Sequence, residues 1–237
     1  MDAQPALAHL RDEPGKAAIL LDVDGTLAPI MPRPEQAFVP DETRDELRRL
    51  AAKYALVACV SGRTGAEAAQ IVGVDELAYV GEHGLELAPE ARMWRDRIQA
   101  FAERVDWPAE QKRLSVSFHY RTAPDEEAAL AVLERVAEEA LEEGLRPRFG
   151  RKVLEVRPPV DADKGTAVRS LLESRGLRRA LYAGDDATDL DAFRGLDGLE
   201  VAVRVAIASP EGPSDLGVAA DLIVGSPTAL LELLRTL

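Results

Sequence analysis

Residues 17–23 read AAILLDV, and Asp24-Gly25-Thr26 follow them directly. A short, continuous run of apolar residues is typical of a strand that is buried on both faces of a parallel sheet. Because Asp22 and Asp24 stand where this run ends, the carboxyl end of the strand would point at a polar site. We therefore expect a parallel α/β sheet with a site at the end of its first strand.

The segments around this strand alternate between helical and strand patterns. Residues 40–53 carry acids early, bases late and apolar residues at helical spacing, and residues 54–60 form a second buried run. A strand, a helix and a second strand imply a right-handed crossover between parallel strands. The same rhythm predicts helices over 65–72, 166–175 and near 189–194, and strands over 77–80, 180–183 and 200–205.

The middle of the chain follows a different pattern. Residues 113–121 (RLSVSFHYR) alternate between apolar and polar side chains, as in a strand with one buried and one polar face. A helix over 126–143 and a second half-polar strand over 152–157 follow, and Pro158-Pro159 then marks a hinge. Half-buried strands with a covering helix suggest a small antiparallel domain. The predicted fold is α/β, with a doubly wound parallel core of residues 1–86 and 160–237 and a smaller α+β lid of residues 87–159.

Composition and charge limit the classes of partner. The chain has 237 residues, enough for one large or two modest domains, and a formal net charge of -13 that would repel nucleic acids and anionic membranes. Its one cysteine, Cys59, cannot form an internal disulfide, which suits a reducing cytosol. The apolar run 17–21 is too short for a signal core or a membrane span. We expect a soluble, cytoplasmic monomer that acts on a small molecule and binds neither nucleic acid nor membrane.

Asp22 and Asp24 are suited to phosphoryl transfer. Two carboxylates two residues apart at a strand end can reach the same pocket. Asp22 would attack phosphorus and form an aspartyl-phosphate, while Asp24 would protonate the leaving oxygen and later activate water. Two acids can also simply cap a loop. The whole DxDGT sequence after a buried strand favours the catalytic interpretation.

A second acidic cluster, GDDATD, begins at Gly184 and follows another predicted strand. So many like charges indicate a hard divalent cation, and Mg²⁺ prefers oxygen ligands while keeping several waters. We predict a Mg²⁺ site formed by Asp22, Asp24, Asp185 and Asp186. Asp24 would contribute its backbone carbonyl, and Asp189 would lie around the ligands. Acids are also common at helix N-termini, which they stabilise, so the cluster by itself leaves both interpretations open.

Ser61 and Lys164 lie between these two acidic segments in the sequence. Ser61 directly follows the predicted strand that ends at Val60, and Lys164 precedes a predicted helix. A hydroxyl and an ammonium aimed at a phosphoryl group would stabilise the charge on its equatorial oxygens. Taken singly, such a serine is more often a helix cap and such a lysine is more often solvated. The ordered set of four motifs favours the catalytic roles.

That ordered set, DxDGT, a serine after a strand, a lysine and GDDxTD, resembles the four motifs of the haloacid dehalogenase superfamily of phosphatases. The match spans the whole predicted core. The resemblance implies a Rossmann-like core, Mg²⁺, an aspartyl-phosphate intermediate and a mobile α/β cap inserted between the Ser61 and Lys164 motifs. One position departs from the pattern, because Leu190 stands where an acidic residue is expected.

More specific strings resemble the trehalose-6-phosphate phosphatase family. They are Glu82-His83-Gly84, residues 112–121, and residues 151–158 (RKVLEVRP) before Asp163-Lys164-Gly165. In that family the cap holds the glucose units with basic and acidic side chains. The resemblance implies these substrate-binding candidates: Gly62, Arg63, Glu82, His83, Lys112, His119, Arg121, Arg151 and Glu155.

Strand periodicity supports part of this set independently. His119 and Arg121 would share the polar face of one strand, and Glu155 and Arg157 that of another. Such a polar face can form the roof of a pocket. It can also be merely solvated, which is the usual fate of alternating strands.

We therefore expect a phosphatase that hydrolyses trehalose 6-phosphate to trehalose and phosphate. Other phosphorylated sugars are alternative substrates, such as sucrose phosphate, a glucosylglycerate phosphate or a pseudo-disaccharide phosphate. A phospho-acceptor switch is an alternative from another class of protein. A switch needs a long-lived aspartyl-phosphate, whereas Asp24 would hasten the hydrolysis of that group. A sugar-binding module without catalytic activity is the third alternative. The presence of the acidic residues and Lys164 argues against it.

Overall fold

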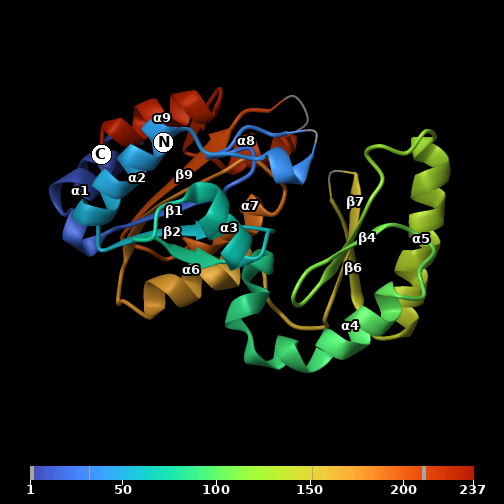
Figure 1. The fold of residues 1–237 in the computed structure, drawn as a ribbon. Helices are drawn as coiled ribbons and strands as arrows, with labels where there is room; N and C mark the ends of the chain where they lie inside the picture. Colours follow the sequence, from blue (N-terminus) through green and yellow to red (C-terminus); the bar gives the residue numbers. More distant parts are fainter. Residues whose placement is uncertain (1–2, 32, 151, 210–211) are drawn as a thin grey trace. The chain divides into compact units, whose positions relative to one another are not determined.

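The computed structural model describes residues 3–31, 33–150, 152–209 and 212–237. Contacts within the chain divide it into two compact units (Figure 1). The core unit comprises Met1–Gly84 and Ala162–Leu237, and the inserted unit comprises Leu85–Asp161. Each unit has its own sheet and its own hydrophobic core, so each is described by itself.

The core unit is built on a parallel sheet with strand order β10-β9-β8-β1-β2-β3. The strands are β1 (Ala18–Leu21), β2 (Leu56–Val60), β3 (Ala78–Val80), β8 (Arg179–Gly184), β9 (Val201–Ile207) and β10 (Leu222–Val224). β1 lies between β2 and β8, with Leu21 level with Cys59 on one side and Ala183 on the other. The strand order runs outward in both directions from β1, which is the doubly wound arrangement. Loops that follow β1, β2 and β8 therefore leave the same edge of the sheet.

Helices cover both faces of this sheet (Figure 1). They are α1 (Gln4–Asp12), α2 (Asp41–Lys53), α3 (Gly65–Val72), α6 (Lys164–Glu173), α7 (Asp189–Gly195), α8 (Ser214–Ala219) and α9 (Pro227–Arg235). Ile19 and Leu21 of β1 pack with α1, α2, α3 and α9, whereas Ala18 and Leu20 pack with α6, α7 and α8. Side chains alternate between the faces of a strand, and all four residues of β1 are buried because both faces are covered.

The inserted unit has an antiparallel sheet with strand order β4-β5-β7-β6. Its strands are β4 (Ala109–Gln111), β5 (Val116–His119), β6 (Arg146–Gly150) and β7 (Val153–Arg157), and its helices are α4 (Arg95–Ala102) and α5 (Glu126–Glu142). Phe118 and Leu154 pack with both helices in one apolar cluster. Ser117 pairs with Glu155 on the opposite face of the sheet. This unit is therefore α+β, and its sheet has one apolar face and one polar face. Among the described residues of the chain, short 3₁₀ helices lie at Pro14–Lys16, Pro34–Gln36, Glu82–Leu87 and Pro89–Trp94.

These sheets and helices confirm the predicted fold class, but several elements differ from the sequence predictions. The strand predicted over 113–121 is limited to Val116–His119, so the prediction that His119 and Arg121 share one strand face is wrong. The chain turns at Tyr120, whose carbonyl accepts a hydrogen bond from the Ala123 N–H at 3.1 Å, and Arg121 lies in that turn. The elements that the sequence analysis missed are β4, β6, β10, α1, α4, α8 and α9.

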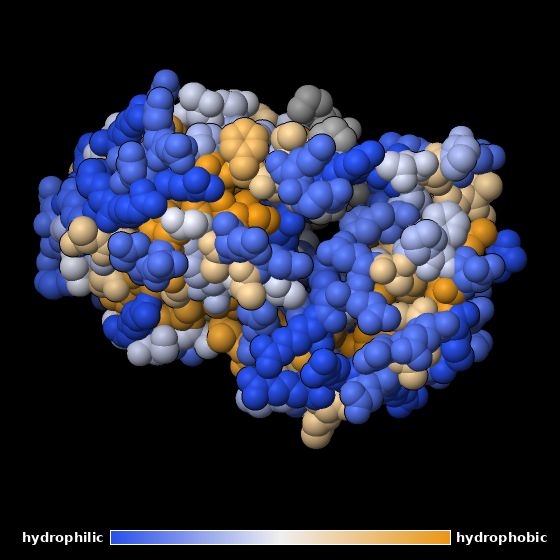
Figure 2. Space-filling view, viewed as in Figure 1, coloured by the Kyte–Doolittle hydropathy of each residue, from blue (hydrophilic) through white to orange (hydrophobic). Residues whose placement is uncertain are grey.

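Hydrophilic residues predominate on the visible surface of each unit, with hydrophobic residues in smaller areas between them (Figure 2). Among the described residues, no helix combines the length and the apolar character needed to cross a lipid bilayer.

Candidate active site

Asp22 and Asp24 lie at the carboxyl end of the central strand of the core unit. The Asp22 N–H donates to the Ala183 carbonyl at 2.9 Å, which continues the pairing of β1 with β8 past Leu21. Gly25 has φ +82, and a Cβ atom added there would lie 2.2 Å from Oδ2 of Asp185. Only glycine combines this backbone conformation with such close approach. The DxDGT loop therefore packs directly against the second acidic cluster.

Lys164 joins the two acidic segments through its ammonium group. Its Nζ lies 2.8 Å from Oδ1 of Asp22 and 2.7 Å from Oδ1 of Asp189. Lys164 is 2% exposed and Asp22 is 5% exposed, so these charges interact in a site largely closed to water. Burial lowers the pKa of Lys164, but the carboxylates of Asp189 and Asp22 outweigh burial and raise it, so the ammonium stays charged.

Asp189 accepts hydrogen bonds at both of its carboxylate oxygens. Oδ1 accepts from Nζ of Lys164 and from the Tyr182 hydroxyl, each at 2.7 Å. Oδ2 accepts from the backbone N–H groups of Asp185 and Asp186, at 2.9 and 2.8 Å. Four donors thus fix the Asp189 side chain, which in turn fixes the loop between β8 and α7. From the sequence, Asp189 was predicted to lie around the metal ligands, and Tyr182 was not predicted to belong to the site.

A hydroxyl group in the otherwise apolar predicted strand 180–183 is the signal that could have identified Tyr182. Its neighbours in β8 are buried, and Tyr182 itself is 0% exposed. A buried hydroxyl needs a hydrogen-bond partner. Burial and then the nearby carboxylates of Asp189 and Asp22 raise the pKa of Tyr182, so the hydroxyl keeps its proton and donates.

Three buried carboxylates of the core unit could hold a cation. Asp22, Asp185 and Asp189 each offer one oxygen, and these oxygens all lie within 4.8 Å of one another. Burial raises the pKa of Asp22 well above its ordinary value; Lys164 opposes the rise, and Asp189 and Asp185 add to it. Three carboxylates so close together repel one another. An oxygen-lined, negatively charged site of this kind fits a hard divalent cation such as Mg²⁺.

Arg63 makes a two-point contact with Asp24. Nε of Arg63 donates to Oδ2 of Asp24 at 2.6 Å, and Nη2 donates to Oδ1 at 2.7 Å. The planar guanidinium thereby sets the orientation of the carboxylate plane. Arg63 lies in the loop after β2, so the structure brings the segment that carries Ser61 to Asp24, the predicted general acid. Arg63 was predicted to bind substrate, and in the structure it contacts Asp24.

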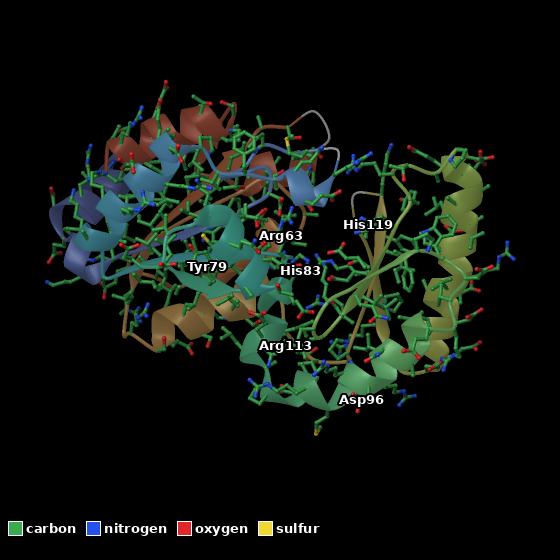
Figure 3. The ribbon with its side chains drawn as sticks, viewed as in Figure 1. Arg63, Tyr79, His83, Asp96, Arg113 and His119 are labelled. Carbon is green, nitrogen blue, oxygen red and sulfur yellow. The ribbon has the colours of Figure 1, made fainter. Side chains whose placement is uncertain are left out.

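Gly62, Glu82 and His83 also belong to the core unit. Glu82 is 0% exposed, and its N–H donates to the Arg63 carbonyl at 2.7 Å. The His83 N–H donates to the Ser61 carbonyl at 2.9 Å. The loops after β2 and β3 are therefore joined by their backbones, and Figure 3 shows the labelled Arg63 and His83 close together.

The remaining substrate-binding candidates belong to the inserted unit. Nζ of Lys112 lies 3.3 Å from Oε1 of Glu155, and the Ser115 hydroxyl donates to the same oxygen at 3.2 Å. His119 faces Glu110, with 2.5 Å between Nε2 and Oε2. Arg121 lies in the turn after β5. Arg151, the last candidate, lies outside the described residues.

The core-unit groups have the chemistry that phosphoryl transfer needs. Asp22 offers a carboxylate oxygen as nucleophile, and Lys164 offers a fixed positive charge 2.8 Å from it. Asp24, with its side chain 40% exposed, can exchange protons with solvent or with a leaving group. An anionic ester bound there would meet the Lys164 ammonium and an acidic cluster that could hold a cation.

Comparisons with known proteins point in the same direction. The family model described as Trehalose-phosphatase matches residues 20–110 and 108–216. The probable trehalose-phosphate phosphatase 9 of Oryza sativa subsp. japonica is 35% identical over 225 residues, covering 76% of this chain and 59% of the relative. An uncharacterised glycosyl hydrolase of Mycobacterium tuberculosis is 36% identical over 220 residues, covering 80% of this chain and 16% of the relative. The chain thus spans less than two thirds of the length of these relatives.

A solved structure shares the fold over nearly the whole chain. The C-terminal domain of the Candida albicans trehalose-6-phosphate phosphatase superposes with a TM-score of 0.78 and 22% sequence identity. The superposition covers 98% of this chain and 95% of that one.

Proposed function

The chain belongs to the trehalose-phosphatase family, and from this premise we propose that it hydrolyses trehalose 6-phosphate to trehalose and inorganic phosphate. One observation carries the proposal: the buried Asp22 carboxylate is held 2.8 Å from the Lys164 ammonium and beside Asp185 and Asp189. This is an arrangement for capturing a phosphoryl group. The family and the name of the rice relative support trehalose 6-phosphate as the substrate.

In the proposed reaction, an oxygen of Asp22 attacks phosphorus and the bond to the sugar oxygen breaks. Asp24 gives its proton to the departing oxygen, then takes one from the water that hydrolyses the aspartyl-phosphate. Lys164 keeps Asp22 in place and balances part of the charge on the transferring group. Ser61 follows β2 at the same edge of the sheet, where its hydroxyl can donate to a phosphoryl oxygen.

We propose that Mg²⁺ is the cofactor of this reaction. Asp22, Asp185 and the backbone carbonyl of Asp24 would hold the ion, with Asp186 and Asp189 around them. When bound, the ion would neutralise charge on the phosphoryl oxygens. The cluster of Asp22, Asp185 and Asp189 oxygens within 4.8 Å supports this assignment. The four protein donors to Asp189 support a role for Asp189 in fixing the loop rather than in direct coordination.

We also propose that residues 87–159 are a cap domain and that residues 1–86 and 160–237 are the catalytic domain. The division of the chain by its contacts supports these two bodies. Within the proposed cap, Lys112 and Glu155 offer an ammonium and a carboxylate 3.3 Å apart, a pair suited to sugar hydroxyls. His119, Arg121 and Arg151 remain further candidates for holding the sugar.

A cytoplasmic location and a monomeric state belong to the same proposal. The one cysteine, Cys59, is buried in β2, and burial raises the pKa of its thiol, so the group is poorly reactive. Such a thiol is suited to a reducing compartment. Sedimentation of the purified protein would test the monomeric state.

The decisive variant is Asp22→Asn, assayed by phosphate release from trehalose 6-phosphate. The amide has nearly the same shape but cannot serve as the nucleophile, so we expect kcat to fall by ~10⁴-fold or more. The matched control is Asp96→Asn, at an exposed position of α4, which should keep the wild-type rate. Near-normal turnover by Asp22→Asn would overturn the mechanism.

A panel of sugar phosphates tests the substrate. We expect the highest kcat/KM for trehalose 6-phosphate, followed by other disaccharide phosphates such as sucrose phosphate. A higher kcat/KM for a glucosylglycerate phosphate or another member of the panel would retain the phosphatase chemistry and reject the proposed sugar.

A further inference from the structure

The turn that follows β3 has an unusual backbone. Glu82 has φ 49, His83 has φ 54 and Gly84 has φ 97, so three successive residues are in the left-handed region. Glu82 and His83 have side chains, which make this conformation unfavourable. Such strain persists only where the surrounding structure enforces it, and it concentrates at functional sites. The sequence 82–84 is also a string that sequence analysis singled out.

The loop after β2 enforces this conformation. The N–H groups of Glu82 and His83 donate to the carbonyls of Arg63 and Ser61, at 2.7 and 2.9 Å. Within the loop, the Arg63 N–H donates to the Ser61 hydroxyl at 3.2 Å. A Cβ atom added to Gly81 would lie 2.1 Å from the Gly65 nitrogen, so the two backbones are in direct contact. The loops after β2 and β3 are therefore held together along their backbones.

The imidazole of His83 lies against Gly62. A Cβ atom added at Gly62 would lie 2.7 Å from both Cε1 and Nε2 of the ring. Real Cβ atoms do not approach other atoms so closely, so the ring occupies the space that a side chain at residue 62 would need. Gly62 lies between the two residues of the loop that carry chemistry, Ser61 and Arg63. Figure 3 shows the labelled His83 beside Arg63.

We propose that His83 is a positioning residue: its imidazole, packed on Gly62, fixes the segment that carries the Ser61 hydroxyl and the Arg63 guanidinium. Arg63 holds both carboxylate oxygens of Asp24, at 2.6 and 2.7 Å, so the position of the general acid depends on the same contact. This role rests on the proposed function and replaces the sugar contact that the family resemblance implies for His83. A displacement of about 1 Å in such groups can lower a rate by ~10²-fold.

The kinetic test uses His83→Asn and two substrates. Asparagine tolerates the left-handed conformation and lacks the two ring atoms that reach Gly62, so the variant removes the contact without adding backbone strain. We expect kcat to fall by between about tenfold and a hundredfold, and by the same factor, for trehalose 6-phosphate and for p-nitrophenyl phosphate, which has no sugar. KM should change little. A rise in KM for trehalose 6-phosphate with normal turnover of p-nitrophenyl phosphate would make His83 a sugar contact and overturn the proposal.

A double-mutant cycle tests the contact without any substrate. We expect Gly62→Ala to lower the melting temperature in the wild-type background, because the new methyl group collides with the ring. The same substitution should cost little in the His83→Asn background, where that space is open. Equal losses in the two backgrounds would overturn the proposal. A failure of the proposed function would instead appear as an inactive wild-type protein with the coupling intact.

The matched control is His9→Asn, at an exposed position of α1. It repeats the chemical change far from the loop and should leave both the melting temperature and kcat at their wild-type values. A comparable loss of kcat in His9→Asn would mean that the effect of His83→Asn is not specific to the Gly62 contact, which would also reject the proposal.

Discussion

At the scale of single residues, Tyr182 shows how a group outside the motifs can support the site. Its hydroxyl donates to Asp189 at 2.7 Å, on the oxygen that Lys164 also contacts. Its ring packs edge to face with Phe193, with centroids 6.1 Å apart. Without the hydroxyl, Oδ1 of Asp189 would accept a hydrogen bond from Lys164 but not from residue 182. The side chains of Asp189 and Lys164 would then be held less firmly.

We predict that Tyr182→Phe lowers both stability and turnover. Loss of a hydrogen bond to a charged acceptor should reduce the free energy of unfolding by about 2 kcal/mol. A less firmly held Lys164 should lower kcat for trehalose 6-phosphate while KM changes little, because the substitution acts on Asp189 and Lys164 and not on a predicted sugar-binding residue. Urea denaturation and steady-state kinetics on the same preparations measure both effects.

Tyr79→Phe is the matched control for this prediction. The Tyr79 hydroxyl donates to the Val74 carbonyl at 2.7 Å, a neutral acceptor outside the active-site loops. Its removal should cost about 1 kcal/mol and leave kcat unchanged. If Tyr182→Phe behaved in the same way, the hydroxyl of Tyr182 would have no part in positioning Lys164.

At the scale of elements, the start of α6 places Lys164. Asp163 precedes the helix and accepts a hydrogen bond from the Thr166 N–H at 2.7 Å, while the Asp163 N–H donates to the Thr166 hydroxyl at 2.9 Å. This reciprocal capping fixes the first turn of the helix. Lys164 is the first residue of that turn, so the cap fixes the backbone position from which the Lys164 side chain extends.

We predict that Asp163→Ala lowers the free energy of unfolding by about 1 kcal/mol and lowers kcat as well. Ser226→Ala serves as the control, because Ser226 caps α9 by accepting from the Ala229 N–H at 3.1 Å. It should cost a similar free energy without changing kcat. Equal kinetics for the two variants would show that capping of α6 matters only for stability.

At the scale of the whole molecule, the excess of buried carboxylates makes the fold sensitive to cations. The carboxylates of Asp22, Asp185 and Asp189 lie close together, and the Lys164 ammonium contacts those of Asp22 and Asp189. We predict that Mg²⁺ raises the melting temperature of the core unit. At a concentration about one hundred times Kd, the stabilisation would be about 2.7 kcal/mol. Thermal unfolding with Mg²⁺, compared with K⁺ at equal ionic strength, measures this effect.

The effect of Mg²⁺ should also depend on pH. Burial raises the pKa of Asp22 in the metal-free protein, so the folded state keeps a proton that the unfolded chain releases near the ordinary carboxyl value. The proton on Asp22 therefore stabilises the metal-free fold, and this stabilisation is fully present at pH values below the ordinary carboxyl pKa. It is lost as pH rises through the raised pKa of Asp22 in the folded protein. Mg²⁺ requires the carboxylate, so its stabilising effect should grow over the same range. An effect of Mg²⁺ that is independent of pH, or unchanged in Asp185→Asn, would contradict the assignment.

The sequence by itself determined the class of fold and predicted the segments of the candidate site. The apolar run before Asp22 predicts a doubly covered strand, and β1 is buried at all four positions. Such features are local, because an apolar run or a motif is readable without knowing what packs on it. Short elements such as β4 and β6 were missed, because these strands, with few apolar residues, exist through pairing with β5 and β7.

Only the tertiary structure decided which side chains meet. The Arg63 contact with Asp24 joins the loops after β2 and β1, and the packing of His83 on Gly62 joins the loops after β3 and β2. The Tyr182 hydrogen bond to Asp189 joins β8 to the start of α7. Their geometry depends on the register of β1 with β2 and β8 and on the exact paths of the loops. A sequence pattern gives the period of a strand, but it does not give the alignment of one strand with the next. That alignment determines which charges and hydroxyls come within bonding distance.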